Sequence, residues 1–590
     1  MPTFAMFSIS FKKLHAYLIV LVGLIALPFV TNCQGFLKAE GGKIVNASGQ
    51  NVLLRGMGLG GWMLQEGYML RVNGIGQQQH SIRQHIEKLV GKEKTEAIYN
   101  NWLLNHTTRK DIEAMKKWGF NSVRLPMHYN LYTLPVAQEK VKGKNTWLKK
   151  GFEMTDSLLA WCKDNQMYLI LDLHGAPGGQ GHDLNISDAN PNEPFLWESP
   201  ENQEKTIALW KELANRYKNE TWIGGYDILN EPNWGFTDST DKNGLKEAVN
   251  APLKELLVNI TKAIRSVDPH HIIIIEGNGW GNNYSGMLPP WDSNMVLSFH
   301  KYWNYNNTDA IQTFLNYREK YNVPIWLGET GENSNVWFTQ AIRLMEANNI
   351  GWCWWPLKKI GINNPLEITS NPEYDSILAY WSGKGAAPTA ATAWKGLSQL
   401  AASSHFSKNI VHADVIDAMF RQINTQNTRP VLRQPVQPGT VIPAVEYDLG
   451  RNGSAYYDSD TADYHISDGT HGGNKFRTFR NDGVDIKKDG KTPVVSGIEN
   501  GEWLQYTIEV AKAGNYSIGC LVSGTAGEIT ISIPSNGKPV AVSVPVNTNS
   551  KDWQWVHTKP IALSKGKQVL RIAFPVGGFD FKEIQFQLAN

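Results

Sequence analysis

Between about residue 40 and residue 402, short runs rich in β-branched and aromatic residues alternate with longer segments of helical periodicity. The eight runs span residues 52–55, 122–126, 167–174, 223–231, 271–276, 295–302, 324–329 and 351–355. Amphipathic segments lie between them at 112–118, 152–164, 204–217, 253–267 and 338–347. This alternation is typical of βα units around a parallel sheet, and eight strands are the number in a (β/α)8 barrel. We therefore predict an α/β fold, with a TIM barrel over residues 36–423.

Polar or aromatic side chains close most of these runs. Seven of the eight end in this way, on Arg124, His174, Asn230 with Glu231, Glu276, His300 with Tyr302, Glu329 and Trp355. In such barrels the chemistry is built at the carboxyl ends of the strands. We therefore expect these side chains to converge on one mouth of the barrel.

Two of the terminal carboxylates, Glu231 and Glu329, would face each other across that mouth. Hydrolysis of a glycosidic bond needs one acid to protonate the leaving oxygen and one carboxylate to attack the sugar or to activate water. A separation near ~5 Å would predict retention of configuration, and one near ~9 Å inversion. Simpler interpretations stay open at this point, because a terminal glutamate can be a solvated loop residue and Arg124 a core ion pair. His174 and His300 could likewise be structural imidazoles.

Several strings in this region resemble glycoside hydrolase family 5. They are RLP at 124–126, DLHGAPG at 172–178, NEP at 230–232, HKY at 300–302, GET at 328–330 and GWCWWPLK at 351–358. The resemblance implies a retaining enzyme with Glu231 as general acid/base and Glu329 as nucleophile. By the same resemblance, Asn230 would hold the sugar 2-hydroxyl, and Arg124 would keep Glu329 ionised.

The resemblance also assigns the surrounding side chains. His174 and His300 would line the reactive subsite, Tyr302 would donate a hydrogen bond to the nucleophile, and Trp355 would form the floor under the sugar ring. Residues 55–70 and 172–183 are similar to the branch of the family that contains exo-acting β-1,3-glucanases, where Glu66 would bind sugar hydroxyls. Glu66 as a loop carboxylate that caps the next helix is the alternative.

The insertion at 71–105 has no clear counterpart in that branch, so endo and exo action both stay open. Trp234 and Trp303 lie within three residues of predicted catalytic-face residues. Their flat apolar rings could stack on sugars in further subsites, although a wall or core position is the alternative.

The chain changes character beyond the barrel region. Residues 424–443 hold four prolines and no periodic apolar face, which predicts a semi-rigid linker. Residues 444–590 contain alternating runs separated by Gly, Asn and Pro turns, typical of an antiparallel β-sandwich of the jelly-roll kind.

This part resembles carbohydrate-binding module family 6 in the strings at 446–458, 479–486, 501–510, 551–555 and 577–586. By that resemblance Phe479 and Trp553 would sandwich a sugar. Lys582 stands where such modules usually have an asparagine, which leaves the ligand open. Pro443 and Val445 occupy places where acids often hold calcium, so we expect no calcium and no other metal or cofactor.

The amino-terminal segment predicts export. Lys12 and Lys13 precede an apolar run at 18–30 that is shorter than the roughly 20 residues needed to span a bilayer. Residues 1–35 therefore predict a secretory signal rather than a transmembrane helix, with lipidation at Cys33 and ordinary cleavage nearby as open alternatives. We expect a secreted or periplasmic protein, or an outer-membrane lipoprotein at the cell surface.

A net charge of +2 without like-charge runs argues against a nucleic-acid partner. Three scattered cysteines besides Cys33 form no metal motif. The favoured function is a monomeric, secreted retaining hydrolase of a β-1,3-, β-1,4- or mixed-linkage β-glucan with an appended polysaccharide-binding module. A β-mannanase or xylanase of the same fold, or a non-catalytic glycan-binding surface protein, is the alternative.

Overall fold

The computed structural model describes residues 34–432, 435–459, 475–524, 527–533, 540–546 and 552–589. The predicted signal segment up to Cys33 lies outside these residues, so signal function, lipidation and location stay predictions. Residues 36–590 form one compact unit. Among the residues described, no helix combines the length and apolarity that crossing a membrane would require.

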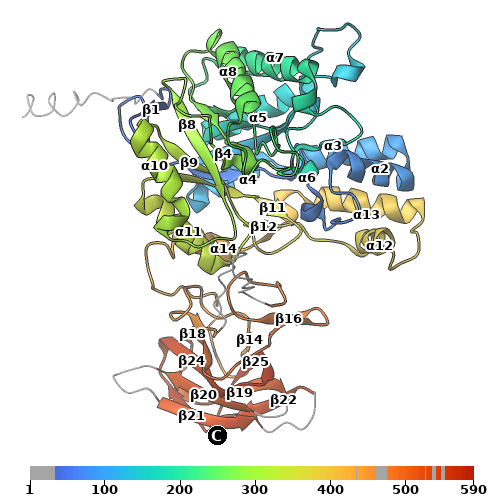
Figure 1. Ribbon diagram of the computed structural model, residues 1–590. Helices are drawn as coiled ribbons and strands as arrows, with labels where there is room; N and C mark the ends of the chain where they lie inside the picture. The colour runs from blue at the N-terminus through green and yellow to red at the C-terminus, as the bar shows by residue number, and fades with distance from the viewer. Residues whose placement is uncertain are drawn as a thin grey trace, which may run out of the picture. The chain divides into compact units, whose positions relative to one another are not determined.

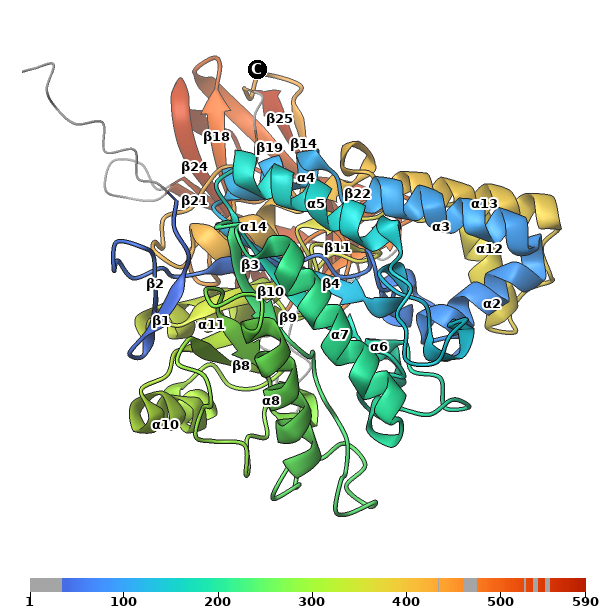
Figure 2. The same ribbon diagram turned by 90° about the horizontal axis from the view of Figure 1, so that it is seen from above.

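Eight parallel strands close into a barrel, which confirms the predicted fold class. In chain order they are β3 (Arg55–Gly58), β4 (Ser122–His128), β5 (Tyr168–Gly175), β6 (Ile223–Asp227), β7 (Ile273–Ile275), β8 (Met295–Lys301), β9 (Ile325–Gly331) and β10 (Gly351–Trp355). Each strand pairs with its neighbours in sequence, and β10 closes the ring on β3. Figures 1 and 2 show the helices wrapped around these strands.

The first barrel strand differs from its prediction. It spans Arg55–Gly58, whereas the sequence pattern predicted residues 52–55. Val52 instead donates its N–H to the carbonyl of Ile44, in the short β1 (Lys38–Glu40) and β2 (Lys43–Val45) hairpin region. A Cβ at Gly58 would lie 2.5 Å from the ring of Trp355, so only glycine fits there. Glycines weaken a strand signal, and the pattern therefore missed this strand.

Four of the five predicted amphipathic segments lie within helices, and the fifth, 253–267, extends two residues past the end of its helix. The helices that cover the barrel are α4 (Arg109–Trp118), α5 (Lys149–Asp164), α7 (Pro200–Tyr217), α8 (Ala251–Arg265), α10 (Gln312–Tyr321), α11 (Asn335–Ala347) and α14 (Ala413–Phe420), with the short α6 (Leu184–Ser187) and α9 (Asn278–Gly281) in loops. Helix α4 shows how such elements are delimited. Thr108 and Asp111 form a capping box at its start, and Gly119 ends it in the left-handed conformation.

The long insertion after the first strand becomes part of a helical annex. It forms α2 (Gln79–Val90) and α3 (Lys92–His106), which pack with α12 (Pro372–Trp381) and α13 (Ala390–Ser403) around an apolar core of their own. Figures 1 and 2 show the four helices side by side on one flank of the barrel. A small separate sheet is formed by β11 (Lys358–Lys359), β12 (Leu366–Glu367) and β13 (Ile410–Val411). Lys358, in β11, forms a fully buried ion pair with Asp111, with 2.6 Å between Nζ and Oδ1.

The carboxyl-terminal part consists of antiparallel sheets, as predicted. One sheet contains β14 (Val441–Pro443), β16 (Ile486–Asp489), β17 (Thr492–Val495), β19 (Gly514–Gly524), β22 (Gln554–His557), β23 (Ile561–Leu563) and β25 (Phe579–Leu588). The other contains β15 (Tyr456–Tyr457), β18 (Glu502–Val510), β20 (Gly527–Ile533), β21 (Val540–Val546) and β24 (Gly566–Val576).

Part of the predicted linker belongs to this sandwich. Val436 is buried and donates its N–H to the carbonyl of Glu509, and β14 pairs with β25. The stretch at 435–443 is therefore held against the sandwich rather than extended between domains. The domain boundaries themselves stay a prediction.

Candidate active site

The predicted site residues gather around one cleft at the carboxyl ends of the barrel strands. The cleft measures about 1100 Å³. Among its lining residues are Glu66, His174, Glu231, His300, Tyr302, Trp303, Glu329 and Trp355. Arg124 and Asn230 are fully buried beside the cleft. They contact residues that line the cleft but do not line it themselves. The convergence expected from the strand ends is thus present.

Arg124, in β4, holds four carboxylates around one buried guanidinium. Its Nη1 lies 2.5 Å from Glu329 Oε1 and 3.2 Å from Asp172, its Nε 2.8 Å from Asp227, and its Nη2 3.1 Å from Glu276. Burial raises the pKa of Asp227 well above its usual value, with the charge of Glu276 adding to the rise and Arg124 opposing it. One neighbour of the guanidinium therefore favours its neutral form, which reduces the number of negative charges gathered there.

Glu329, at the end of β9, accepts hydrogen bonds from two sides. Arg124 contacts its Oε1, and the Tyr302 hydroxyl donates to its Oε2 over 3.1 Å. A buried cation and a hydroxyl donor both stabilise a negative carboxylate. This is the environment that an ionised nucleophile needs.

Glu231 follows β6 in a different environment. Its Oε1 lies 2.6 Å from Nδ1 of His300, and its backbone N–H donates to Glu276 Oε2 over 2.7 Å. Burial raises the pKa of Glu231 to about 7, with His300 opposing the rise and the charges of Glu329 and Glu276 adding to it. Near neutral pH this carboxyl can therefore carry a proton.

His300 is the partner of Glu231 in this contact. Burial alone would lower the pKa of His300, but the carboxylates of Glu276, Glu329 and Glu231 together raise it well above its usual value. Its Nε2 lies 3.2 Å from Glu276 Oε1. Glu231 and His300 are in direct contact, so the protonation state of each affects that of the other.

Ligand atoms of Glu231, His300 and Glu329 all lie within 4.8 Å of one another. One oxygen of Glu231 and one of Glu329 therefore lie within 4.8 Å of each other, and the separation of two carboxyl groups is the quantity that distinguishes the two classes of glycosidase. Among the described residues, these three side chains are also spaced closely enough to hold a metal ion. Arg124 and His300 already supply positive charge to both carboxylates, so a cation there would have to compete with them.

His174 and Trp355 form one wall of the cleft. Their rings stack with centroids 5.0 Å apart and 14° between planes, and His174 Nδ1 lies 2.8 Å from Asp172. The Trp355 indole N–H donates to the hydroxyl of Tyr68 over 3.0 Å. Because both rings are held at their edges, the indole has a fixed orientation. Tyr68 was not predicted, since nothing in its local sequence distinguishes it.

Beneath the cleft, Asn230 accepts a hydrogen bond from Arg124 Nη2 over 2.8 Å. Its Nδ2 lies 3.5 Å from His174 Nε2. Glu66 is buried at the cleft wall, and burial together with the charge of Glu329 raises its pKa well above the usual value. Glu66 therefore favours the neutral form, which can donate as well as accept a hydrogen bond.

The two predicted tryptophans differ in their placement. Trp303 is 36% exposed in the cleft, and its indole N–H donates to the carbonyl of Glu332 over 3.3 Å. Trp234 is not among the cleft-lining residues, and its ring stacks on His182 with centroids 4.0 Å apart. A subsite at Trp234 is therefore not supported by its position. Trp280 lines the cleft instead, with its indole N–H 3.2 Å from Asp183.

Residues 83–361 match the model described as Cellulase (glycosyl hydrolase family 5), and residues 477–588 match that of Carbohydrate binding module (family 6). The barrel is a family 5 domain. The carboxyl-terminal sandwich carries a family 6 module, so both predicted families are confirmed.

Known relatives of the family 5 domain carry different names. It is similar to a "Beta-xylosidase" of Phanerodontia chrysosporium, with 35% identity over 43% of this chain and 48% of the relative. An "Endoglucanase C" of Acetivibrio thermocellus is 26% identical over 43% of this chain and 84% of the relative. A "Probable glucan 1,3-beta-glucosidase A" of Aspergillus clavatus is 25% identical over 44% and 58%. The chain thus spans about half the length of two of these relatives. Together they support a glycosidase without fixing its substrate.

The two predicted sugar-binding residues of the family 6 module differ in exposure, since Phe479 is exposed and Trp553 is partly buried. Phe479 is 41% exposed, with a φ of 67°. Trp553 donates its indole N–H to Asp489 over 3.0 Å, and the Nζ of Lys582 lies 4.9 Å from the centre of its ring. Lys582 also pairs with Asp489 over 3.0 Å, so the residue that replaces the usual asparagine covers the indole. Binding of a sugar between the two aromatic residues stays a prediction.

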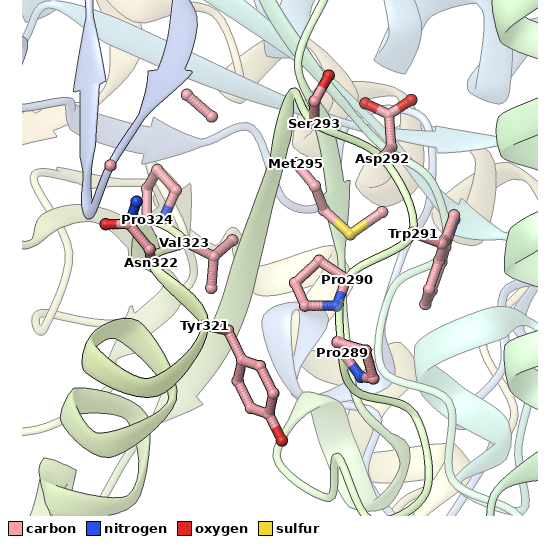
Figure 3. Close-up of a pocket in the computed structure, with 12 residues that line it drawn as sticks. Pro289, Pro290, Trp291, Asp292, Ser293, Met295, Tyr321, Asn322, Val323 and Pro324 are labelled. Carbon is pink, nitrogen blue, oxygen red and sulfur yellow. The ribbon is translucent and has the colours of Figure 1, made fainter.

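A second hollow, of about 530 Å³, lies on the other side of the family 5 domain (Figure 3). Met295, at the start of β8, and Pro324, just before β9, line it, so it opens at the amino ends of the strands. Asp292, also at its rim, forms an ion pair with Arg265 over 2.7 Å. Its lining contains no pair of carboxylates, whereas Glu231 and Glu329 lie at the carboxyl ends of the strands.

Proposed function

We propose that the protein is a retaining hydrolase of β-glucosidic bonds in a β-1,3-, β-1,4- or mixed-linkage glucan. The observation that carries the proposal is the pair Glu231 and Glu329, which lie in unlike environments with one carboxylate oxygen of each within 4.8 Å of the other. Carboxyl groups about 5 Å apart suit direct attack on the sugar, whereas inversion needs room for a water molecule between them.

In the first step Glu329 attacks the anomeric carbon while Glu231 donates its proton to the departing oxygen. A covalent glycosyl-enzyme forms, the glucan chain leaves, and the negative charge of Glu329 is lost. In the second step Glu231, now a carboxylate, takes a proton from water as the water attacks the anomeric carbon and releases Glu329. Arg124 and Tyr302 stabilise the charge that Glu329 carries before and after this cycle.

The surrounding residues support the binding roles. Asn230, which is held by Arg124, would bind the 2-hydroxyl, and Trp355 would offer a flat apolar surface to the sugar ring. The family 6 module would hold the polymer near the cleft and so raise its local concentration. Export through the segment at 1–35, as a soluble or lipidated monomer, completes the proposal.

The direct test is Glu329→Gln. We expect loss of nearly all turnover of laminarin, lichenan and carboxymethylcellulose, with polysaccharide binding intact, because the amide cannot form the glycosyl ester. Glu153→Gln, an exposed glutamate of α5, is the matched control and should be fully active. An activated 2-fluoro glucoside should label the peptide that contains Glu329, as seen by mass spectrometry. Full activity of Glu329→Gln, or a label elsewhere, would overturn the proposal.

The relative named as a beta-xylosidase favours a second candidate, a pentose-containing substrate of the same mechanism. Parallel assays on xylan, mannan and pustulan separate this candidate from the glucanase. A rate on xylan that exceeds the rate on every glucan would replace the glucan in the proposal and keep the two carboxylates in their roles.

A further inference from the structure

One segment of the family 6 module is bound tightly to the barrel. The side chain of Asn481 donates to the carbonyl of Asn333 over 2.9 Å and to Asn335 Oδ1 over 3.1 Å. Its backbone N–H donates to Asp414 over 2.8 Å, and its carbonyl accepts the N–H of Asn335 over 2.8 Å. Asn333 lies in the loop that follows β9, the strand that carries Glu329, and Asn335 is the first residue of α11. The segment is therefore fixed to the loop that follows the catalytic strand.

The same segment lines the active-site cleft. Arg477, Asn481 and Asp482 belong to its lining together with Glu231 and Glu329. At about 1100 Å³ the cleft lies at or above the upper end of the ~300–1000 Å³ that is typical of small-molecule sites. It therefore has room for sugar units beyond the one that reacts, and the module contributes to the walls around them.

Arg477 is the residue of this segment whose side chain is available to bind a ligand. Its side chain is exposed, and no hydrogen bond or ion pair is found for it within the described part of the chain. Asp482, by contrast, is occupied by Arg480, 2.7 Å away, and by the hydroxyl of Tyr447. A guanidinium presents five donors in a rigid plane, which suits neighbouring hydroxyls of one sugar ring.

We propose that Arg477 is a specificity-determining residue of the cleft, and that it binds hydroxyls of a glucan unit outside the reactive subsite. The module then acts as part of the active site in addition to acting as a tether. The bonds of Asn481 hold the segment before substrate arrives, so little ordering is needed on binding. This inference rests on the proposed β-glucan hydrolysis.

The test compares substrates of increasing length. For Arg477→Ala in the full chain, we expect the ratio of KM for long β-gluco-oligosaccharides to KM for an aryl β-glucoside to rise about tenfold. Loss of the hydrogen bonds of one charged group should have an effect of this size, because a tenfold change in affinity corresponds to ~1.4 kcal/mol. The kcat values should change little. Asn481→Ala should move the ratio in the same direction, because it loosens the segment.

Lys565→Ala, which removes an exposed cation of the module outside the cleft, is the control and should leave the ratio unchanged. An unchanged ratio in Arg477→Ala would overturn the inference, and so would an equal loss on every substrate. If the wild-type chain hydrolyses no β-glucan, the proposed function fails instead. Calorimetric binding of the same oligosaccharides to wild type and Arg477→Ala then decides the role of Arg477, with equal affinities refuting it.

Discussion

Replacement of Glu276 by glutamine tests how the proposed acid is held in place. Oε2 of Glu276 accepts the backbone N–H of Glu231 over 2.7 Å, and Oε1 lies 3.1 Å from Arg124 Nη2 and 3.2 Å from His300 Nε2. The first two of these neighbours donate hydrogen bonds to Glu276, and the third lies within ion-pair distance of it. Glutamine has the same shape, but its NH2 group must face one of the donors.

A buried donor left without an acceptor costs about 1–3 kcal/mol. We therefore expect the free energy of unfolding of Glu276→Gln to fall by an amount in that range. If the lost contact is the one that positions Glu231, kcat/KM should fall about 10- to 100-fold, since each ~1.4 kcal/mol is a factor of ten. Glu276 also contributes a negative charge that raises the pKa of Glu231 and of His300.

Removal of that charge should shift the pH profile in a defined direction. A raised pKa keeps Glu231 protonated up to about pH 7, and without Glu276 the proton is lost at lower pH. The alkaline limb of kcat/KM should therefore move toward acid. The assay is kcat/KM on lichenan or laminarin from pH 4 to pH 9, with Glu255→Gln, an exposed glutamate of α8, as the control. If the alkaline limb of Glu276→Gln keeps its position and kcat/KM stays within twofold of wild type, Glu276 does not hold Glu231 in the way described.

Three further predictions concern single groups. For wild type, kcat/KM on glucans should fall above about pH 7 as Glu231 loses its proton, whereas an aryl glucoside whose leaving group needs no acid should show no such limb in its first step. Tyr302→Phe removes the 3.1 Å bond to Glu329 and should lower kcat/KM about tenfold without unfolding the protein; a near wild-type value contradicts the role of the hydroxyl. Lys358→Met leaves Asp111 buried without its partner and should lower the free energy of unfolding in urea by about 3–5 kcal/mol, whereas an unchanged midpoint would show that the pair adds nothing.

The arrangement of the barrel could be predicted because its strands and helices have different periodicities. Runs such as 167–174 and 295–302 are continuous apolar stretches that end on polar residues, and both correspond to strands of the closed barrel. The ends of strands also predicted which side chains meet, since parallel strands in a barrel bring their carboxyl ends together. Glu231 and Glu329 lie far apart in the sequence and yet share one cleft for this reason.

Other features depend on contacts that no local pattern records. The role of Glu276 as the acceptor for the Glu231 N–H and for Arg124 follows only from the register of β7 beside β6 and β8. Trp234 follows the NEP string by sequence but turns toward His182, while Trp280 reaches the cleft through a left-handed backbone conformation with a φ of 57°. The contribution of Arg477 depends on how Asn481 is bound to the barrel, which requires both parts of the chain.

The close approach of Gly58 to Trp355 links two ends of the barrel sequence. A Cβ at Gly58 would lie 2.5 Å from the indole, and one at Gly60 would lie 2.7 Å from it. The orientation of the Trp355 indole in the cleft therefore depends on the absence of side chains nearly 300 residues earlier in the chain, at Gly58 in the strand that closes the ring with β10 and at Gly60 just after it. A methyl group at either position would require the indole to shift. The shape of this cleft can thus be altered from behind its wall, by residues that do not line it.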